Sequence, residues 1–407
     1  MQPLRTAAPA VMHGSGYLSV SAGKTFRQRS MARKLKSDKL LFIATLLLIC
    51  VSVVMVYSAS AKIAEARFDD PYRYLAKQAA WVLIGLALVP IVMRIDYRCY
   101  RQPSVIWAGL GLVGLGLVAV LFGSEVNGAK RWLNLGPLGI QPSEMAKIAV
   151  IFFIAALLER RMDRIDEVGY ALLPIGVVTG AVVGLVVMEP DMGTAVSILV
   201  IASAMVFAAG ISWRYIAGLA AVGLPALYLV LMATEYRRAR VAAFFDPWSD
   251  QFGSGYQMIQ SMYAVATGGI FGRGLMGGLQ KLFYLPEPHN DFIYAVIAEE
   301  LGLLGATAIL ACFCIIGWRG LRTATHAPDR FGTFLAIGIT VMIAFQAFFN
   351  ISVVLGLLPT KGIPLPFVSY GGSSLLINLL GMGILLNVSQ HASSTHVITT
   401  TLPTQDA

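Results

Sequence analysis

Long apolar runs recur along this chain at a length that suits the hydrocarbon core of a lipid bilayer. Hydrophobic residues make up 57% of the 407 positions and charged residues only 13%, whereas soluble domains carry about 25% charged residues. A helix that crosses a core of about 30 Å needs about 20 apolar residues. The pattern predicts an all-α polytopic membrane protein with about ten transmembrane helices. The runs are Leu40–Ser58, Ala79–Met93, Val105–Phe122, Met145–Leu158, Ala171–Met188, Ala195–Ala209, Ile216–Met232, Gly302–Trp318, Phe331–Leu358 and Phe367–Val388.

The segment before the first apolar run is strongly basic. Residues 1–39 carry eight Lys or Arg residues and one acid, Asp38. The run that follows is too long for a cleavable signal peptide, and a basic flank is typical of the cytoplasmic side. We therefore expect a disordered cytoplasmic tail (1–39), a membrane domain (40–388) and a second cytoplasmic tail (389–407). This explanation of the basic charge is preferred to nucleic-acid binding.

Two segments between apolar runs are long and fall outside the cell in this topology. They cover residues 123–144 and about 234–290, the latter between the seventh and eighth helices. The second is rich in aromatic residues and interrupted by glycines rather than being a polar linker. Long structured loops often carry function, so we expect this loop to fold back onto the membrane domain.

Ionisable residues at the edge of membrane helices are costly and usually mark a functional site. The first outer loop contains Lys130 and Arg131, followed by Glu144 and Lys147, which share a helix face because they are three residues apart. This group is a candidate for anion binding. The alternative is a local ion pair at the start of a helix.

Two further groups of ionisable residues could each be functional or only structural. Glu189 and Asp191 flank Pro190 at a tight outer turn, where Asp191 could be a site residue or only the N-cap of the next helix. Arg237, Arg238 and Arg240 form an outer cation group that could bind a pyrophosphate or only anionic lipid.

The segment Tyr284–Gly302 carries the most informative acids. Asp291 precedes an apolar helix, and Glu299 and Glu300 lie two to three turns inside it. Such deep acids need partners, for which Lys147 and Lys361 are candidates. Asp291 could act chemically or only cap the helix, and the two glutamates could be only structural.

The segment Leu358–Ser374 combines prolines and glycines with Lys361 and Ser369 between apolar runs. Irregular backbone at membrane depth is tolerated only where protein or a wet cavity surrounds it, and Asn350 adds a polar group nearby. Phosphate-loop, HExxH and GxSxG motifs are absent from the sequence. The histidines and cysteines form no metal or disulfide pattern.

Six blocks in this chain resemble those of the SEDS family of peptidoglycan glycosyltransferases, in the family's order and within Tyr57–Leu386. The basic tail, Met55–Ser60 and Pro359–Gly362 favour the cell-division branch of the family over its elongation branch. The blocks are NGAKRW (127–132), QPSEMAK (141–147), EPDMG (189–193), FFDPW with GSGYQ (244–257), LPEPHNDFIYAVIAEELG (285–302) and LPFVSYGGSS (365–374).

The resemblance implies a ten-helix SEDS fold that polymerises lipid II at the outer face of the bacterial inner membrane, at the division septum. It implies that Asp291 is the catalytic general base and that the outer cations bind the substrate pyrophosphate. A divalent cation, Mg²⁺ or Mn²⁺, could assist, although no ligand set is evident. The implied partners are lipid II, a class B penicillin-binding protein (an FtsI-type transpeptidase) and other division proteins. The candidate substrate-binding residues are Lys130, Arg131, Glu144, Lys147, Arg237, Arg238, Lys361 and Ser369, and the candidate supporting residues are Glu189, Asp191, Glu299, Glu300 and Asn350.

Three alternatives remain open at this stage. A lipid II flippase would line a path with the same charges, and an elongation-type polymerase would share the chemistry. A non-catalytic scaffold that recruits a transpeptidase would not need Asp291. Acids and cations gathered at the outer side, without a matching set inside, favour a polymerase over a flippase.

Overall fold

Helices make up most of the described chain. The computed structural model describes residues 37–123, 130–135, 138–165 and 167–400. Most of the predicted N-terminal tail, and residues 401–407 of the predicted C-terminal tail, lie outside this part. The long helices are α1 (Lys39–Phe68), α2 (Arg73–Arg94), α3 (Pro103–Leu121), α4 (Pro142–Arg161), α5 (Leu173–Met188), α6 (Met192–Ala208), α7 (Trp213–Met232), α10 (Ile293–Thr325), α11 (Arg330–Val354) and α12 (Gly372–Thr400).

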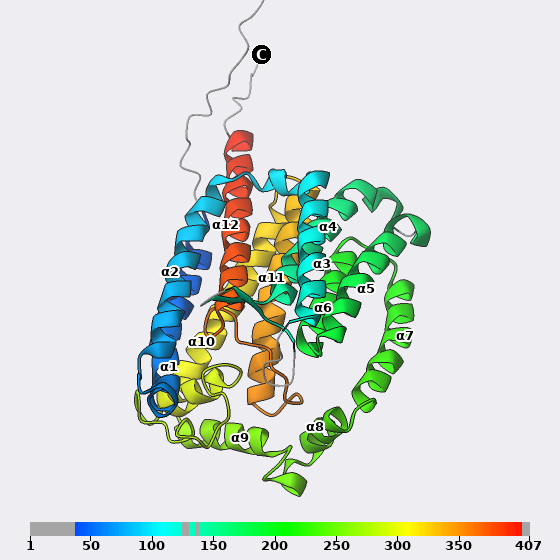
Figure 1. The fold of residues 1–407 in the computed structure, drawn as a ribbon. Coiled ribbons are helices and arrows are strands. Elements are labelled where there is room, and N and C mark those ends of the chain that lie inside the picture. Colours follow the sequence, from blue (N-terminus) through cyan, green and yellow to red (C-terminus); the bar gives the residue numbers. More distant parts are fainter. Residues whose placement is uncertain (1–36, 124–129, 136–137, 166, 401–407) are drawn as a thin grey trace, which may run out of the picture. The chain divides into compact units, whose positions relative to one another are not determined.

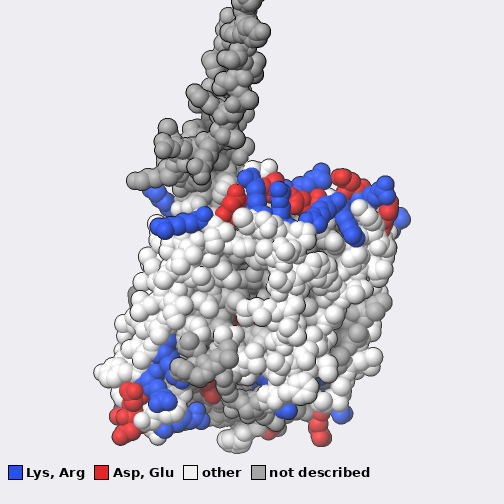
Figure 2. All heavy atoms as spheres, turned by 45° about the horizontal axis from the view of Figure 1, so that its top comes forward, with Lys and Arg blue, Asp and Glu red and all other residues white. Residues whose placement is uncertain are grey.

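The membrane architecture follows from the length and composition of these helices. Seven described helical segments are long and apolar enough to cross a bilayer, and α6 is apolar but shorter. The helices α4, α6 and α7 run alongside them in Figure 1. Charged residues gather at the two ends of the helices, and the belt between them is nearly free of charge on the face shown in Figure 2. The predicted all-helical membrane fold is confirmed, while the number of ten spans remains a prediction.

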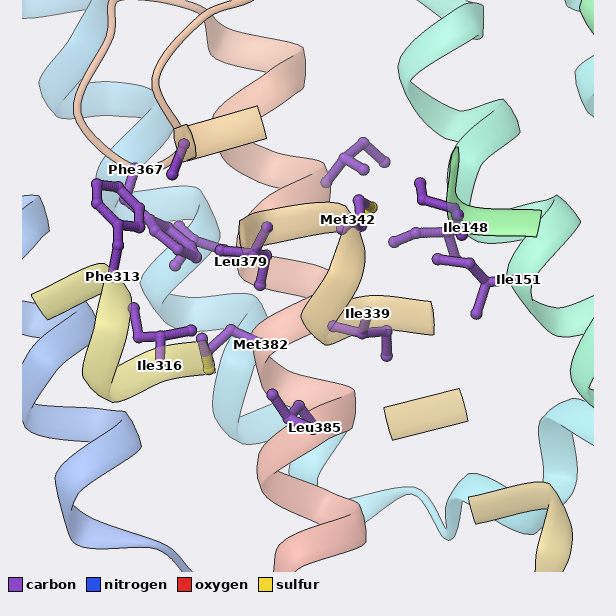
Figure 3. Close-up of a cluster of buried hydrophobic side chains, with 14 of the residues drawn as sticks. Ile148, Ile151, Phe313, Ile316, Ile339, Met342, Phe367, Leu379, Met382 and Leu385 are labelled. Atoms are coloured by element: carbon purple, nitrogen blue, oxygen red, sulfur yellow. The ribbon is translucent and has the colours of Figure 1, made fainter. Parts of the chain in front are cut away.

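The core lies where α4, α10, α11 and α12 meet (Figure 3). Gly381 of α12 allows this approach, because a Cβ atom there would lie 3.1 Å from Met342 and 3.3 Å from Ile339 of α11. Close packing of this kind fixes the relative positions of the helices that carry the polar segments at their ends. The cluster includes Ile148, Ile151, Phe313, Ile316, Ile339, Met342, Phe367, Leu379, Met382 and Leu385.

Both predicted outer segments contain regular structure. In the first, β1 (Leu133–Leu135) pairs antiparallel with β2 (Leu138–Ile140), a short hairpin that the sequence analysis did not predict. The second contains α8 (Glu235–Phe245), the 3₁₀ turn η4 (Pro247–Asp250) and α9 (Tyr256–Gly268). In Figure 1 this loop lies at the end of the bundle opposite the C-terminal end of α12. At that end of α12, helical backbone continues to Thr400, into the predicted 389–407 tail.

The start of α10 is tied to the large loop by backbone contacts. Gly302 has a φ of 66° and a ψ of −165°, so it interrupts the helix, and a Cβ atom there would lie 2.3 Å from the Gly272 amide nitrogen. Four backbone N–H groups donate hydrogen bonds across this junction. The bonds are Arg273 N to Glu299 O, Gly274 N to Glu300 O, Leu303 N to Gly269 O and Leu304 N to Ile270 O, at 2.9–3.2 Å.

The buried acids Glu299 and Glu300 are also satisfied by this loop. Lys281 donates to the Glu300 carboxylate at 2.5 Å, and Ser58 of α1 donates to it at 2.7 Å. The Leu279 amide donates to Glu299 at 2.8 Å. The expectation that Lys147 or Lys361 would pair with these acids is therefore wrong. The loop folds back and supplies the partners, because the Gly302 interruption brings its backbone beside the acids.

The buried pair predicts a large stability effect for Lys281→Met. Lys281 and Glu300 are 5% and 0% exposed, and removal of one partner from a buried ion pair typically costs about 3–5 kcal/mol. The exposed pair Lys62–Glu65 provides a control, since loss of an exposed pair costs less than about 1 kcal/mol. Thermal unfolding of both variants in the same detergent measures the difference. Equal midpoints for Lys281→Met and Lys62→Met would contradict a stabilising role for the buried pair.

Candidate active site

Asp291 lies two residues before α10 and is held through its backbone. The Asn350 side chain of α11 donates to the Asp291 carbonyl at 2.7 Å and to the Ile363 carbonyl at 2.8 Å. Asn350 is only 2% exposed, so these bonds are shielded from water. One amide therefore joins the segment before α10 to the irregular segment between α11 and α12.

The irregular segment makes further contacts with the residues that precede α10. The Ser369 hydroxyl donates to the Asn290 carbonyl at 2.6 Å and accepts from the Leu365 amide at 2.8 Å. The Tyr370 amide donates to the His289 carbonyl at 2.9 Å. The backbone carbonyls of residues 289 and 290 are thus fixed by the irregular segment, and that of residue 291 is fixed by Asn350 of α11. This geometry makes Ser369 a positioning residue, while its predicted contact with substrate stays a prediction.

The Asp291 carboxylate lies against the backbone at Gly362. A Cβ atom at Gly362 would lie 2.9 Å from Asp291 Oδ2, so a larger residue there would force the carboxylate to move. Burial raises the pKa of Asp291 to about 7, and the Glu287 carboxylate adds to this increase. Arg240 and Arg131 act in the opposite direction.

Lys361 lies next to Gly362 and shares these cationic neighbours. Burial lowers the pKa of Lys361 to about 8, and the positive charges of Arg240, Arg237 and Arg131 lower it further. Arg240 also donates to the Thr360 carbonyl at 3.3 Å. Cations from three separate segments thus converge beside Asp291, which is the charge pattern expected of an anion site.

Arg131 fixes the turn between α5 and α6. It donates to the Pro190 carbonyl at 2.6 Å and to the Glu189 carbonyl at 3.4 Å, and its guanidinium lies 4.0 Å from Asp191. Asp191 caps α6 by accepting from the Thr194 amide at 3.3 Å. The predicted capping role of Asp191 is confirmed, and Arg131 holds this turn beside the cation cluster.

The same turn touches the irregular segment. At Gly193, in the first turn of α6, a Cβ atom would lie 2.8 Å from Ile363 and 3.6 Å from the Gly362 carbonyl. Glu189 is fully buried, and neither of its carboxylate oxygens has a hydrogen-bond partner among the described residues. Burial and the nearby Asp191 raise the pKa of Glu189 to about 8, which favours its neutral form at pH 7.

The other predicted ligands have different surroundings. Glu144 and Lys147 form a buried ion pair of 2.8 Å on the first turns of α4. Lys130 is exposed and donates to the Leu121 carbonyl at 3.4 Å. Arg238 is exposed on α8, and the described contacts do not join it or Lys130 to Asp291.

The sequence analysis named Arg240 only as a member of the outer cation group and omitted it from the candidate ligands, and it did not name Glu287 or Gly362 as site residues. Helical spacing could have paired Arg240 with Arg237, because these residues are three apart and share a face of α8. Arg238 is displaced from that face. The contacts of Glu287 and Gly362 depend on long-range folding.

Among the described residues, no group of three or more His, Cys, Asp or Glu side chains could hold a metal ion, and cations surround Asp291, so these residues do not fit a protein-held divalent ion.

Comparisons with known proteins agree with this architecture. A family model for FtsW, RodA and SpoVE, described as "Cell cycle protein", matches residues 38–394. A protein of Geobacter sp. (strain M18) named "Probable peptidoglycan glycosyltransferase FtsW" is 42% identical, over 86% of this chain and 96% of its own. Stage V sporulation protein E of Bacillus subtilis (strain 168) is 41% identical, over 88% of this chain and 99% of its own.

A solved structure shares the fold. A chain from a study of polymerization and crosslinking by a peptidoglycan synthase complex superposes with a TM-score of 0.73 at 31% identity, covering 88% of this chain and 99% of that chain. The family model spans most of the chain and the identities exceed 40% over nearly whole relatives. The chain therefore belongs to the FtsW/RodA/SpoVE family, the SEDS family that its sequence blocks resemble.

Proposed function

We propose that this chain is a peptidoglycan glycosyltransferase that polymerises lipid II at the outer face of the inner membrane during septal wall synthesis. The observation that carries the proposal is the half-buried Asp291 carboxylate beside a cluster of Lys and Arg residues at the loop end of the bundle. A carboxylate near a cation cluster suits a reaction that removes a proton and releases an anion. The name of the Geobacter relative supports the same activity.

In this mechanism the 4-hydroxyl of the acceptor sugar attacks the anomeric carbon of the donor chain. Asp291 takes the hydroxyl proton as the new C–O bond forms, and the bond to the undecaprenyl pyrophosphate breaks with inversion. A positioned base contributes about 10²–10⁴-fold to such a reaction. The pKa of about 7 brings Asp291 close to the pH at which it must accept a proton.

The cations stabilise the charge of the departing pyrophosphate. Arg131, Arg237, Arg240 and Lys361 surround the position where this charge develops, and preorganised cations lower the barrier because they need not reorganise. Lys130 and Arg238 are proposed as outer ligands, and the Glu144–Lys147 pair as a support. A class B penicillin-binding protein is the proposed partner, consistent with a structural relative from a peptidoglycan synthase complex.

Asp291→Asn is expected to reduce glycan polymerisation by about 10²–10⁴-fold. Asparagine has nearly the same shape but cannot accept the proton, and the Asn350 contact survives because it uses the backbone carbonyl of residue 291. The measurement is glycan chain formation from labelled lipid II by the purified protein with its transpeptidase partner. Equal product from both proteins would favour the scaffold, and lipid II transfer across vesicles that withstands the substitution, without polymerisation by either, would favour a flippase.

Polymerisation is expected to follow a bell-shaped pH profile. Below about pH 7 the Asp291 carboxyl is protonated and cannot accept a proton, and above about pH 8 Lys361 loses its positive charge. The measurement is kcat/KM between pH 5.5 and 9.5.

Two variants test the acid and alkaline limbs of this pH profile separately. Glu287→Gln removes a charge that raises the pKa of Asp291, so the acid limb should move to lower pH. Lys361→Arg should remove the alkaline limb, because a guanidinium remains charged throughout this range. An acid limb that is the same in wild type and Glu287→Gln would argue against Asp291 as the titrating base.

Arg240→Gln is expected to lower kcat about 10–100-fold, somewhat less than the loss of a single fixed oxyanion donor. Arg238→Gln is the comparison variant, since it removes the same charge from the same helix at an exposed position, and as an outer ligand it should lower kcat less than Arg240→Gln does. Steady-state kinetics on lipid II measures both variants. If Arg238 binds substrate as strongly as Arg240, the two variants will be equally impaired, and the assignment from helix face will be wrong.

A further inference from the structure

A second polar site lies at the end of the bundle opposite Asp291. The start of α1, the last turns of α10 and the Ser389–Ala392 part of α12 surround a cavity of about 630 Å³. This volume is in the range of small-molecule sites, about 300–1,000 Å³. Its charged lining residues are Asp38, Lys39, Arg319 and Arg322, together with His326.

The ion pairs in this cavity leave a surplus of positive charge. Arg319 donates to the Asp38 carboxylate at 2.6 Å, and Asp38 also caps α1 by accepting from the Leu40 amide at 3.0 Å. The one acid of the lining is therefore already neutralised. Lys39 and Arg322 are exposed and have no carboxylate partner among the described residues. Their charges remain available for an anion.

Apolar side chains flank the same cations. Leu40 lines the cavity and is 46% exposed, and the Trp318 ring, which is 60% exposed, lies 5.6 Å from the Arg319 guanidinium. Tryptophan is typical of the membrane–water interface, where one part of its ring system is apolar and the other polar. A ligand at this position would contact cations at one end and exposed apolar surface at the other.

We propose that this cavity binds the phosphate headgroup of an anionic phospholipid, with its acyl chains along the exposed apolar residues of α1 and α10. Basic pockets between membrane helices on the cytoplasmic side bind such headgroups. A soluble phosphate would contact the cations but not the exposed apolar side chains beside them. These apolar side chains therefore favour a lipid over a soluble phosphate.

The test uses the full-length protein in neutral detergent, titrated with phosphatidylglycerol or with phosphatidylcholine of the same acyl chains. Native mass spectrometry measures retained lipid, and thermal unfolding measures stabilisation. Wild type should retain phosphatidylglycerol in preference to phosphatidylcholine. The double variant Lys39→Gln/Arg322→Gln should bind phosphatidylglycerol about tenfold or more weakly, because each basic residue near the surface contributes to the attraction.

The matched control is Arg164→Gln/Arg330→Gln, which removes two exposed cations from the same end of the bundle but outside the cavity. It should bind phosphatidylglycerol as wild type does. Arg319 is left intact because its loss would leave the buried Asp38 unpaired. Equal weakening by both double variants, or equal retention of the two lipids, would overturn the site. Glycerol phosphate is the third arm, and equal affinity for it would assign the cavity to a soluble anion instead.

Discussion

A charged carboxylate that is buried in an apolar helix bundle needs a hydrogen-bonding or ionic partner. This requirement determines how the loop end of the molecule is arranged. Glu300 is fully buried and receives hydrogen bonds from Lys281 and Ser58. Burial of either charge alone would cost several kcal/mol. The loop that carries Lys281 therefore has to fold onto the start of α10, and α1 is drawn into the same network.

Asp291 and Lys361 have environments that move their pKa values towards each other. Burial raises the pKa of the acid to about 7 and lowers that of the amine to about 8. Shifts of this kind suit catalysis near neutral pH, because a catalytic group is most effective when its pKa lies near the operating pH. The backbone bonds from Asn350 and Ser369 hold the acid in place without occupying its carboxylate. Backbone carbonyls thus hold Asp291 in position, and its carboxylate remains available for proton transfer.

The sequence was sufficient for the helices and for the short list of ionisable residues near the site. Apolar run length predicts the all-helical membrane fold, although the number of ten spans remains a prediction, and Asp291, Lys361 and Arg131 were candidates because charges at membrane depth are rare. The partners of Glu299 and Glu300 were mispredicted, because Gly302 reads as an ordinary glycine within an apolar run. The contact of Gly362 with Asp291 joins segments about 70 positions apart, and local spacing contains no information about such a pair.

The interruption at Gly302 also divides α10 into a short piece and a long piece. The short piece Ile293–Leu301 is bonded to the backbone of the loop, while the longer part of α10 continues through the bundle beyond a glycine that does not maintain helical geometry. The two pieces of α10 therefore have different supports. Backbone hydrogen bonds to the loop hold the short piece, and Asn350 of α11 holds Asp291 just before it, so the place of this acid does not depend on the part of the helix beyond Gly302.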